Sequence, residues 1–314
     1  MAICGQSPLP RINRLTPRRP VKLCVIINPN AGSVKDFDLL RSKIEKLKPS
    51  HTHVTAEPGD AQAHAIEAMR TGCNYIVAAG GDGTLNEVIN GIAKHAAHVR
   101  IGLIPLGTGN DFARCLNLPI SVDENIDLLL SAETIAIDLV RVQSDQTRYF
   151  VNVSAGGFSG MVDEKVTPEI KRNWGPLAYV RGAAAAFPEL RAYRTSILLG
   201  EKETFSIDLY NVIVANGRYV AGGLPIAPEA DPTDGLLDVI LIPERPKSEI
   251  VLLAAEILLG KHLESSTITF RRTTKVSIKS RPGMWFNVDG ELVGNDPATF
   301  EIMPRALQFV AGKR

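Results

Sequence analysis

Short apolar segments alternate with segments of helical periodicity over roughly the first 130 residues of the chain. Apolar runs typical of buried strands occupy residues 21–27, 53–56, 75–79 and 99–105. Apolar positions recur at helical spacing at residues 37–47, at 61–70 with Asp60 as the cap, from 85 to about 97, and again from residue 112. Strands that alternate with helices in this way predict an α/β domain with a parallel sheet and helices on both faces.

The pattern changes after about residue 134. Strand-like segments separated by turns follow at residues 134–142, 149–153, 195–199, 204–214, 237–241, 267–270, 275–278, 285–288 and 299–302. Helical spacing interrupts them at about 177–189 and about 248–259. This second half predicts a mainly antiparallel β domain, built as two packed sheets. The last apolar segment, residues 306–310, could return to the first domain.

Composition restricts the class of protein further. The chain has 314 residues, which is enough for two domains, and its 45% hydrophobic and 22% charged residues are typical of a soluble globular protein. A net charge of +1 gives no electrostatic argument for a nucleic-acid partner. No apolar run reaches the roughly 18 residues that a transmembrane segment requires, so we expect any membrane contact to be peripheral.

The cysteines and the N-terminal segment bear on localisation. Cys4, Cys24, Cys73 and Cys115 form neither a CxxC pair nor a metal-binding spacing, and free thiols in a reducing cytoplasm fit them best. Residues 1–20 are rich in Arg and Pro and lack the apolar stretch of a secretory signal. We expect them to form a disordered tail, with a weak electrostatic arm for lipid headgroups as the alternative.

A glycine-rich turn follows the apolar run at 75–79. Gly80, Gly81, Asp82, Gly83 and Thr84 connect that strand to the next helix. Glycine lets the backbone approach a phosphate group, and a helix N-terminus presents unpaired N–H groups to it. Asp82 adds a carboxylate that could hold Mg²⁺ beside the phosphates. The alternative is a tight turn in which Asp82 caps the helix.

A second turn of the same type, residues 107–111, follows the apolar run at 99–105. Thr84 and Thr108 offer hydroxyl groups to a phosphate or a ribose, Asn110 lies in the second turn, and Asn28 ends the first strand at the same edge of the sheet. Ligands of open α/β sheets bind beyond the carboxyl ends of the strands. Neither turn has the P-loop or the GxGxxG pattern, so the sequence predicts a nucleotide site of another type.

Six segments together resemble the diacylglycerol kinase catalytic-domain family, in particular the bacterial soluble lipid kinases. Sphingosine kinases and NAD kinases are similar to it more distantly. The resemblance covers roughly residues 21–310 and is carried by residues 28–32, 80–84, 105–113, 215–218, 227–239 and 287–291. It implies an ATP-dependent kinase with an N-terminal nucleotide domain and a C-terminal β-sandwich. The active site would lie in the cleft between them, and the last strand would rejoin the first domain.

The same resemblance divides the chain into a tail at 1–20, a nucleotide-binding domain at 21–133 plus 305–314, and a lipid-substrate domain at 134–304. It implies that residues 80–84 bind the phosphates of ATP, that Asp82 faces Mg²⁺, and that Thr55 and Thr108 contact the nucleotide.

The resemblance also implies catalytic and metal-binding residues. Glu291 would accept the proton of the acceptor alcohol, and Asp138 would lie near that centre. A second, structural Mg²⁺ would be held by the Asp234 side chain and by the backbone carbonyls of Asp231 and Leu236. For Glu291 the alternative is a solvated carboxylate on a hairpin turn, because Asp289-Gly290 is a strong hairpin signal.

These expectations combine into one functional hypothesis. The protein is a cytoplasmic, peripherally membrane-associated kinase of phospholipid biosynthesis that transfers the γ-phosphate of ATP to a lipid hydroxyl, with diacylglycerol as the first candidate and phosphatidic acid as the product. The alternatives are a kinase for a soluble acceptor, similar to NAD kinase, and a nucleotide-binding regulator without turnover. A homodimer is left open. Candidates for acyl-chain contact are Trp174, Leu177, Tyr179, Val180 and Phe187, for which a core helix is the other interpretation.

Overall fold

The computed structural model describes residues 21–131, 133–159, 162, 181–182, 185–294 and 297–312. Of the candidates for acyl-chain contact, only Phe187 falls within them. It opens a short 3₁₀ helix, η3 (Phe187–Glu189), and residues 177–180 and 183–184 of the helix predicted at 177–189 lie outside the described residues. Among the described residues, no helix combines the length and the apolar character needed to cross a bilayer.

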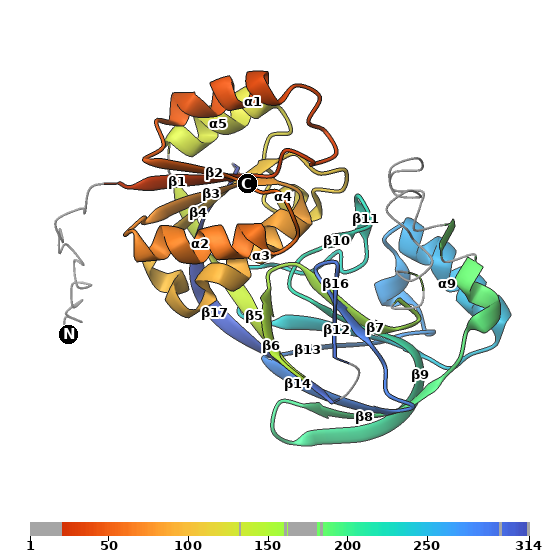
Figure 1. Ribbon diagram of the computed structural model, residues 1–314. Coiled ribbons are helices and arrows are strands. Elements are labelled where there is room, and N and C mark those ends of the chain that lie inside the picture. The colour runs from red at the N-terminus through yellow and green to blue at the C-terminus, as the bar shows by residue number, and fades with distance from the viewer. Residues whose placement is uncertain are drawn as a thin grey trace, which may run out of the picture.

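The N-terminal part is a parallel sheet (Figure 1). Its first strands are β1 (Leu23–Ile27), β2 (His51–Val54), β3 (Tyr75–Gly80) and β4 (Arg100–Pro105). They lie in the order β2-β1-β3-β4, and the end of β17 (Ala298–Val310) adds to β4 in parallel through Gln308 and Phe309. Every pair in this order is parallel, as the alternation of strands and helices predicts.

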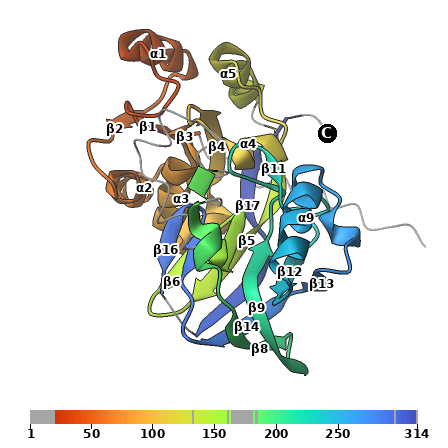
Figure 2. The same cartoon turned by 90° about the vertical axis from the view of Figure 1, so that its right-hand side faces the viewer.

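Helices cover both faces of this sheet (Figures 1 and 2). Residues of α1 (Phe37–Ile44) and α5 (Val122–Ser131) pack against Val25 and Ile27, whereas α2 (Asp60–Arg70) and α3 (Asp82–Ile92) pack against Cys24 and Ile26. Alternate residues of β1 therefore serve two separate cores. This explains why the strand is apolar throughout.

Several boundaries differ from those expected from sequence. Asp60 is the first residue of α2 and does not cap it: its carboxylate accepts hydrogen bonds from the N–H groups of Ala56 and Glu57, while Gly59 occupies the N-cap position. The helix expected to reach about residue 97 ends at Ile92 and continues as 3₁₀ helix η2 (Ala93–His98). Helix α5, whose first turn is acidic, was not predicted from the sequence.

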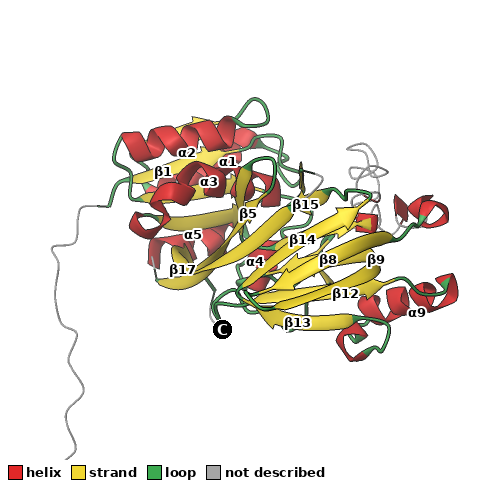
Figure 3. Ribbon diagram, turned by 90° about the horizontal axis from the view of Figure 1, so that it is seen from below, coloured by secondary structure: helices red, strands yellow, loops and turns green. Residues whose placement is uncertain are grey.

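The C-terminal part is an antiparallel β-sandwich (Figure 3). It contains β5 (Thr134–Gln143), β6 (Thr147–Phe150), β7 (Val153–Gly157), β8 (Tyr193–Leu199), β9 (Glu203–Ala215), β12 (Leu237–Pro243), β13 (Thr269–Thr273), β14 (Lys275–Arg281), β15 (Phe286–Val288) and β16 (Glu291–Val293). All recorded pairings among them are antiparallel. The aromatic rings of Phe150, Phe286 and Phe300 meet edge to face in the core, with centroids 5.3 and 6.2 Å apart.

Three further elements lie outside the strands of the sandwich. β10 (Tyr219–Val220) and β11 (Leu224–Pro225) form a separate small ribbon. Helix α9 (Lys247–Leu258) follows β12, close to the range expected from its periodicity. The prediction of fold class is therefore confirmed: an α/β part with a parallel sheet is followed by a mainly antiparallel β-sandwich.

One long strand connects the two parts. The segments expected at 299–302 and 306–310 are a single strand, β17, whose first half pairs with β14 and whose last residues pair with β4. β5 follows it on the other side, and the pairing shifts between Met303 and Leu307, where Arg305 has a φ of +53°. Because β17 passes through residues 304–305 without ending, the domain boundary proposed there lies inside a strand.

Candidate active site

The two glycine turns are in direct contact at the carboxyl ends of β3 and β4. A Cβ on Gly107 would lie 2.6 Å from the Cα of Gly81, and a Cβ on Gly80 would lie 2.3 Å from Oγ1 of Thr84. The N–H of Leu106 also donates to the carbonyl of Gly80 at 2.8 Å. Glycine is required at Gly107 because its backbone packs on that of Gly81, and at Gly80 because the side chain of Thr84 occupies the place of a Cβ.

Asp82 connects the first turn to the second. Its Oδ2 and Oδ1 accept hydrogen bonds from the N–H groups of Asp111 and Phe112, both at 3.2 Å. These two residues begin the short helix α4 (Asp111–Cys115). The N-cap of α3 is Gly81, so Asp82 does not have the helix-capping role considered as its alternative. The carboxylate holds the two loops together instead.

The amide side chains of Asn28 and Asn110 stabilise the same edge of the sheet. Asn28 follows β1, accepts from the N–H of Asn30 and donates to Oγ1 of Thr84 at 3.2 Å. Asn110, with a φ of +51°, bonds both the N–H and the carbonyl of Gly107, at 2.9 and 2.8 Å. Both amide side chains therefore stabilise the turns by hydrogen bonds to groups within them.

The two threonines outside the first turn also lie at this edge. Thr55 follows β2 and donates its N–H to the carbonyl of Ile27 at 2.9 Å. Thr108 is exposed, and its Oγ1 lies 2.5 Å from where a Cβ on Gly32 would be. The structure thus brings together all the residues predicted to bind nucleotide from Asn28 to Asn110.

Three carboxylates surround this edge, and burial raises the pKa of each. The pKa of Asp82 is raised, and that of Asp111 is raised to about 6 by burial and by the charge of Asp82. One oxygen of Asp111 accepts from the N–H of Gly222 at 3.0 Å, but Oδ1 is buried without a hydrogen-bond partner. Burial and the charge of Asp82 also raise the pKa of Asp289, to about 7. Asp289 comes from the second part of the chain, so the site has contributions from both.

Asp289 anchors the hairpin that carries Glu291. The two-residue turn between β15 and β16 has φ values of +45° at Asp289 and +95° at Gly290, as a two-residue Asp-Gly hairpin requires. The carboxylate of Asp289 accepts from the N–H groups of Val151 and Val153, at 3.1 and 2.9 Å. Glu291 is the first residue of β16 and is half-buried. The sequence predicted a role for Glu291 but none for Asp111 or Asp289, although both lie within the motifs that carry the family resemblance.

The other predicted residues form a separate group. Asp138 is fully buried and its carboxylate accepts from the N–H groups of Gly235 and Arg305, both at 2.7 Å. Burial raises the pKa of Asp138, and the neighbouring acidic charges that raise it further are Asp234 and Asp231. The structure therefore brings Asp138 to the loop at 231–236. The interactions recorded for it connect it to neither Asp82 nor Glu291.

The loop at 231–236 has a compact turn geometry. The carbonyl of Asp231 accepts from the N–H of Asp234 at 3.2 Å, and Oδ1 of Asp234 accepts from the N–H of Leu236 at 2.9 Å. Within the described part of the chain, no group of three or more His, Cys, Asp or Glu side chains is arranged to hold a metal ion. A cation at this loop would depend on backbone carbonyls, which are acceptable ligands for Mg²⁺ and Ca²⁺.

The first group fits a magnesium-bound nucleotide. The unpartnered Oδ1 of Asp111 and the carboxylate of Asp82 are hard oxygen ligands at one place. Nothing lies within 4 Å of where a Cβ on Gly83 would be, so the N-terminal turn of α3 is open to a phosphate. Mg²⁺ commonly takes one or two carboxylates and fills its remaining positions with substrate phosphates and water.

Comparison with known proteins follows the same division of the chain. Residues 22–142 match the model of the diacylglycerol kinase catalytic domain, and residues 152–311 match that of the YegS C-terminal NAD kinase beta sandwich-like domain. A diacylglycerol kinase of Staphylococcus haemolyticus is 30% identical, with 92% of this chain and 88% of the relative covered. One from Staphylococcus epidermidis is 31% identical, with 92% of both covered.

Solved structures share the fold. A putative diacylglycerol kinase from Bacillus anthracis superposes with a TM-score of 0.79 at 22% identity, covering 93% of this chain and 95% of that one. An NAD kinase from Archaeoglobus fulgidus in complex with ATP gives a TM-score of 0.52 at 15% identity, covering 93% and 94%. The two matched models and the identity to the curated relatives show that this chain belongs to the diacylglycerol kinase catalytic-domain family.

Proposed function

We propose that the protein transfers the γ-phosphate of ATP to the hydroxyl group of a membrane lipid, with diacylglycerol as the acceptor and phosphatidic acid as the product. The observation that carries this proposal is the proximity of Asp82, which joins the two glycine turns, to Asp289, which anchors the hairpin of Glu291: the charge of Asp82 contributes to the raised pKa of Asp289. A phosphate-binding edge from one part of the chain thereby faces a carboxylate-bearing turn from the other.

Each group has a role in the transfer. The N–H groups at the start of α3 and the glycine turns bind the phosphates, and Asp82 and Asp111 are the carboxylates that would hold Mg²⁺. When bound, Mg²⁺ neutralises charge on the phosphate oxygens. Thr55, Thr84 and Thr108, with Asn28 and Asn110, border the nucleotide.

The acceptor hydroxyl loses its proton to Glu291. A new bond forms between the hydroxyl oxygen and the γ-phosphorus, while the bond to the oxygen that bridges the β- and γ-phosphates breaks and ADP leaves. A general base in this role contributes roughly 10²–10⁴-fold to the rate. Because Asp289 fixes the turn two residues before Glu291, we assign Asp289 a positioning role.

Exposed apolar side chains favour a lipid acceptor over a soluble one. Trp285 and Leu292 are 47% and 45% exposed, and the pairing of β15 with β16 puts both on one face of the hairpin that carries Glu291. Val251, Leu252, Leu258 and Leu259 are also exposed, on α9 and directly after it. These surfaces support the proposal that a cytoplasmic enzyme makes peripheral contact with the membrane.

For Asp138 we propose a role in holding the loop at 231–236. Its carboxylate bonds the N–H of Gly235, next to Asp234, and that of Arg305 on β17. A second Mg²⁺ would use the Asp234 side chain and the carbonyls of Asp231 and Leu236. Asp138 would then affect catalysis through the order of this loop.

The test is transfer of radiolabelled γ-phosphate from ATP to a panel of lipids in mixed micelles with Mg²⁺. Glu291→Gln should lower kcat by about 10²–10⁴-fold and leave ATP affinity unchanged, whereas Asp82→Asn should weaken the binding of Mg²⁺-ATP. Glu201→Gln, in the exposed turn between β8 and β9, is the matched control. NAD is offered as an acceptor in a parallel reaction. If it becomes labelled and no lipid does, the acceptor is a soluble molecule and not a lipid. ATP binding without any transfer would support a regulator.

A further inference from the structure

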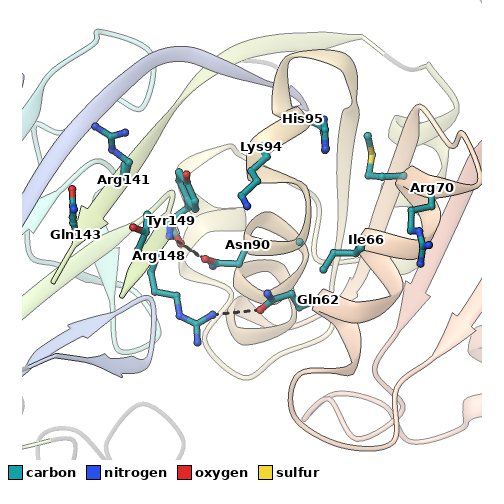
Figure 4. Close-up of a pocket in the computed structure, with 13 residues that line it drawn as sticks. Gln62, Ile66, Arg70, Asn90, Lys94, His95, Arg141, Gln143, Arg148 and Tyr149 are labelled. Atoms are coloured by element: carbon teal, nitrogen blue, oxygen red, sulfur yellow. Dashed lines mark hydrogen bonds between the residues drawn. The ribbon is translucent and has the colours of Figure 1, made fainter. Parts of the chain in front are cut away.

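A cavity lies between the helices of the N-terminal part and the sandwich (Figure 4). Its volume is about 800 Å³, within the range of roughly 300–1,000 Å³ that small-molecule sites occupy. One wall comes from α2, the C-terminal end of α3 and η2, which carries Lys94, and the other comes from β5 and β6. Asn90 lies eight residues after Asp82 on α3, so the cavity is separated from the glycine turn by about 12 Å along the helix axis.

The lining of this cavity is basic. Arg70, Lys94, Arg141 and Arg148 contribute to it, and no Asp or Glu is among its lining residues. Two of these cations already have partners outside the cavity, since Arg141 pairs with Glu301 and Arg70 with Glu67. No carboxylate of the described residues lies within ion-pair distance of Lys94 or Arg148, so two positive charges there are unneutralised.

Arg148 has an unsatisfied donor at this place. Its Nη1 donates to the amide oxygen of Gln62 on α2 at 3.4 Å, while its Nε is buried and has no hydrogen-bond partner. A buried donor without a partner is costly, and the cost is greater for a charged group. Arg148 lines the cavity, and its planar guanidinium matches the oxygens of a phosphate group bound there.

We propose that this cavity binds the phosphate group of a phosphate ester, either a free metabolite or the headgroup of an anionic lipid. Arg148 and Lys94 recognise the charge from opposite walls. Gln62 contributes an amide beside Arg148. Ile66 and Met69 on α2 line the cavity next to these charges and can contact the organic part of the ester. The site shares no residue with the proposed nucleotide site.

A ligand here would hold the two parts of the chain together. Its walls already meet at Asn90, whose side-chain amide bonds both the N–H and the carbonyl of Tyr149 on β6, at 3.0 and 2.9 Å (Figure 4). β6 leads directly to Val151 and Val153, which donate to Asp289. A bound anion therefore favours the same arrangement that positions the hairpin of Glu291, and it should raise the melting temperature by mass action.

Titration calorimetry and thermal unfolding of the full chain with inorganic pyrophosphate, without Mg²⁺, test the proposal. Lys94→Gln should weaken binding about tenfold, and Arg148→Gln at least as much, because each removes one charge-assisted contact. Lys279→Gln removes an exposed lysine of β14 outside the cavity and should bind like the wild type. Lys94 is exposed, so its variant tests the site even if Arg148→Gln fails to fold.

Further arms identify the source of the phosphate and exclude the nucleotide site. The first arm measures whether the protein sediments with phosphatidylcholine vesicles that contain phosphatidic acid. If Lys94→Gln abolishes this sedimentation and Lys279→Gln retains it, the phosphate is that of a lipid headgroup. Pyrophosphate binding with no Lys94-dependent sedimentation identifies a free phosphate ester. If Lys94→Gln matches the wild type in both assays, or if Mg²⁺-ATP displaces all the pyrophosphate, the proposal is wrong. If the wild-type protein binds pyrophosphate but does not bind ATP, the result contradicts the proposed kinase function and leaves the cavity proposal intact.

Discussion

Asp289 and Val153 are joined by two hydrogen bonds that run in opposite directions. Oδ1 of Asp289 accepts from the N–H of Val153 at 2.9 Å, and the N–H of Asp289 donates to the carbonyl of Val153 at 3.1 Å. These bonds attach the turn between β15 and β16 to the first residue of β7. Asp289 lies next to Gly290, so the position of Glu291 depends on a carboxylate that is itself not the proposed base.

Replacement of Asp289 by Ala should reduce turnover more than substrate binding. The change leaves the N–H groups of Val151 and Val153 without their acceptor, which costs about 1–3 kcal/mol for a buried donor. The free energy of unfolding, kcat and KM of the variant are the quantities to measure. Asp127→Ala, an exposed aspartate on α5, is the control. A loss of stability with an unchanged kcat would show that the hairpin needs no such anchor.

The raised pKa values of Asp111 and Asp289 predict a stability that falls as pH rises. Their pKa values are about 6 and about 7 in the folded protein, against about 4 in the unfolded chain. Between pH 4 and 7 the unfolded chain therefore loses protons that the folded protein still holds. This lowers the free energy of unfolding by an amount on the order of 3 kcal/mol for each carboxyl, and the loss is complete above about pH 7.

Urea unfolding of the free protein from pH 4 to pH 8 measures this dependence. Asp111→Asn should make the free energy of unfolding less dependent on pH up to about pH 6. Asp289→Asn should do the same up to about pH 7, because an amide does not titrate in this range. Mg²⁺-ATP should show the opposite trend and bind more tightly as pH rises, since the carboxylates must be ionised to hold Mg²⁺. A free energy of unfolding that rises steadily from pH 4 to pH 7 would contradict the assigned pKa shifts.

The architecture was predictable because local patterns determine it. Continuous apolar character in β1 and β3 and helical spacing in α1 to α3 predicted a parallel sheet. Local sequence also led to the prediction of a ligand site at the two glycine turns, which the structure brings into contact. Helix α5 was missed because Val122 is followed by the polar run Asp123-Glu124-Asn125, which interrupts its apolar periodicity in the first turn. Asp60 was wrongly predicted to cap α2. Its carboxylate can accept either from the N–H groups of the helix or from those of the preceding loop, and in the structure it accepts from Ala56 and Glu57 of the loop.

The roles of Asp289 and Asp138 depend on contacts that the sequence does not display. Asp289 in an Asp-Gly dipeptide has the pattern of a surface turn, and only the return of residues 151–153 beneath it makes the carboxylate an anchor. Asp138 lies in a strand between apolar neighbours, and its partners are 97 and 167 residues away. Hydrogen bonds over such separations follow from the tertiary fold, which local periodicity cannot predict.

Gly80 and Gly83 should respond differently to substitution by Ala. At Gly80 the new Cβ would lie 2.3 Å from Oγ1 and 2.5 Å from Cβ of Thr84, so we expect the fold to lose several kcal/mol or fail to form. At Gly83 nothing lies within 4 Å, and Ala should stabilise α3 by about 0.4–1 kcal/mol. If the open space holds a phosphate, Gly83→Ala should still weaken ATP binding.

Thermal unfolding and ATP titration of both variants distinguish these effects. Gly59→Ala is the comparison for Gly83→Ala, because it also meets no atom within 4 Å but has a φ of +93° and should be destabilised by backbone strain alone. Unchanged ATP affinity in a stable Gly83→Ala protein would show that the phosphates do not approach the first turn of α3.

Substitutions of Asp234 and Asp138 should have different effects on the melting temperature, because we propose that Asp234 binds a metal ion and that Asp138 holds the loop that carries Asp234. Asp234 is exposed, so Asp234→Asn should keep the melting temperature measured in EDTA and lose any rise that Mg²⁺ causes in the absence of nucleotide. Asp138→Asn should lower the melting temperature under both conditions, because the amide cannot accept from both Gly235 and Arg305. Asp127→Asn is the control for both. Retention of the full Mg²⁺ effect in Asp234→Asn would exclude this loop as the second cation site.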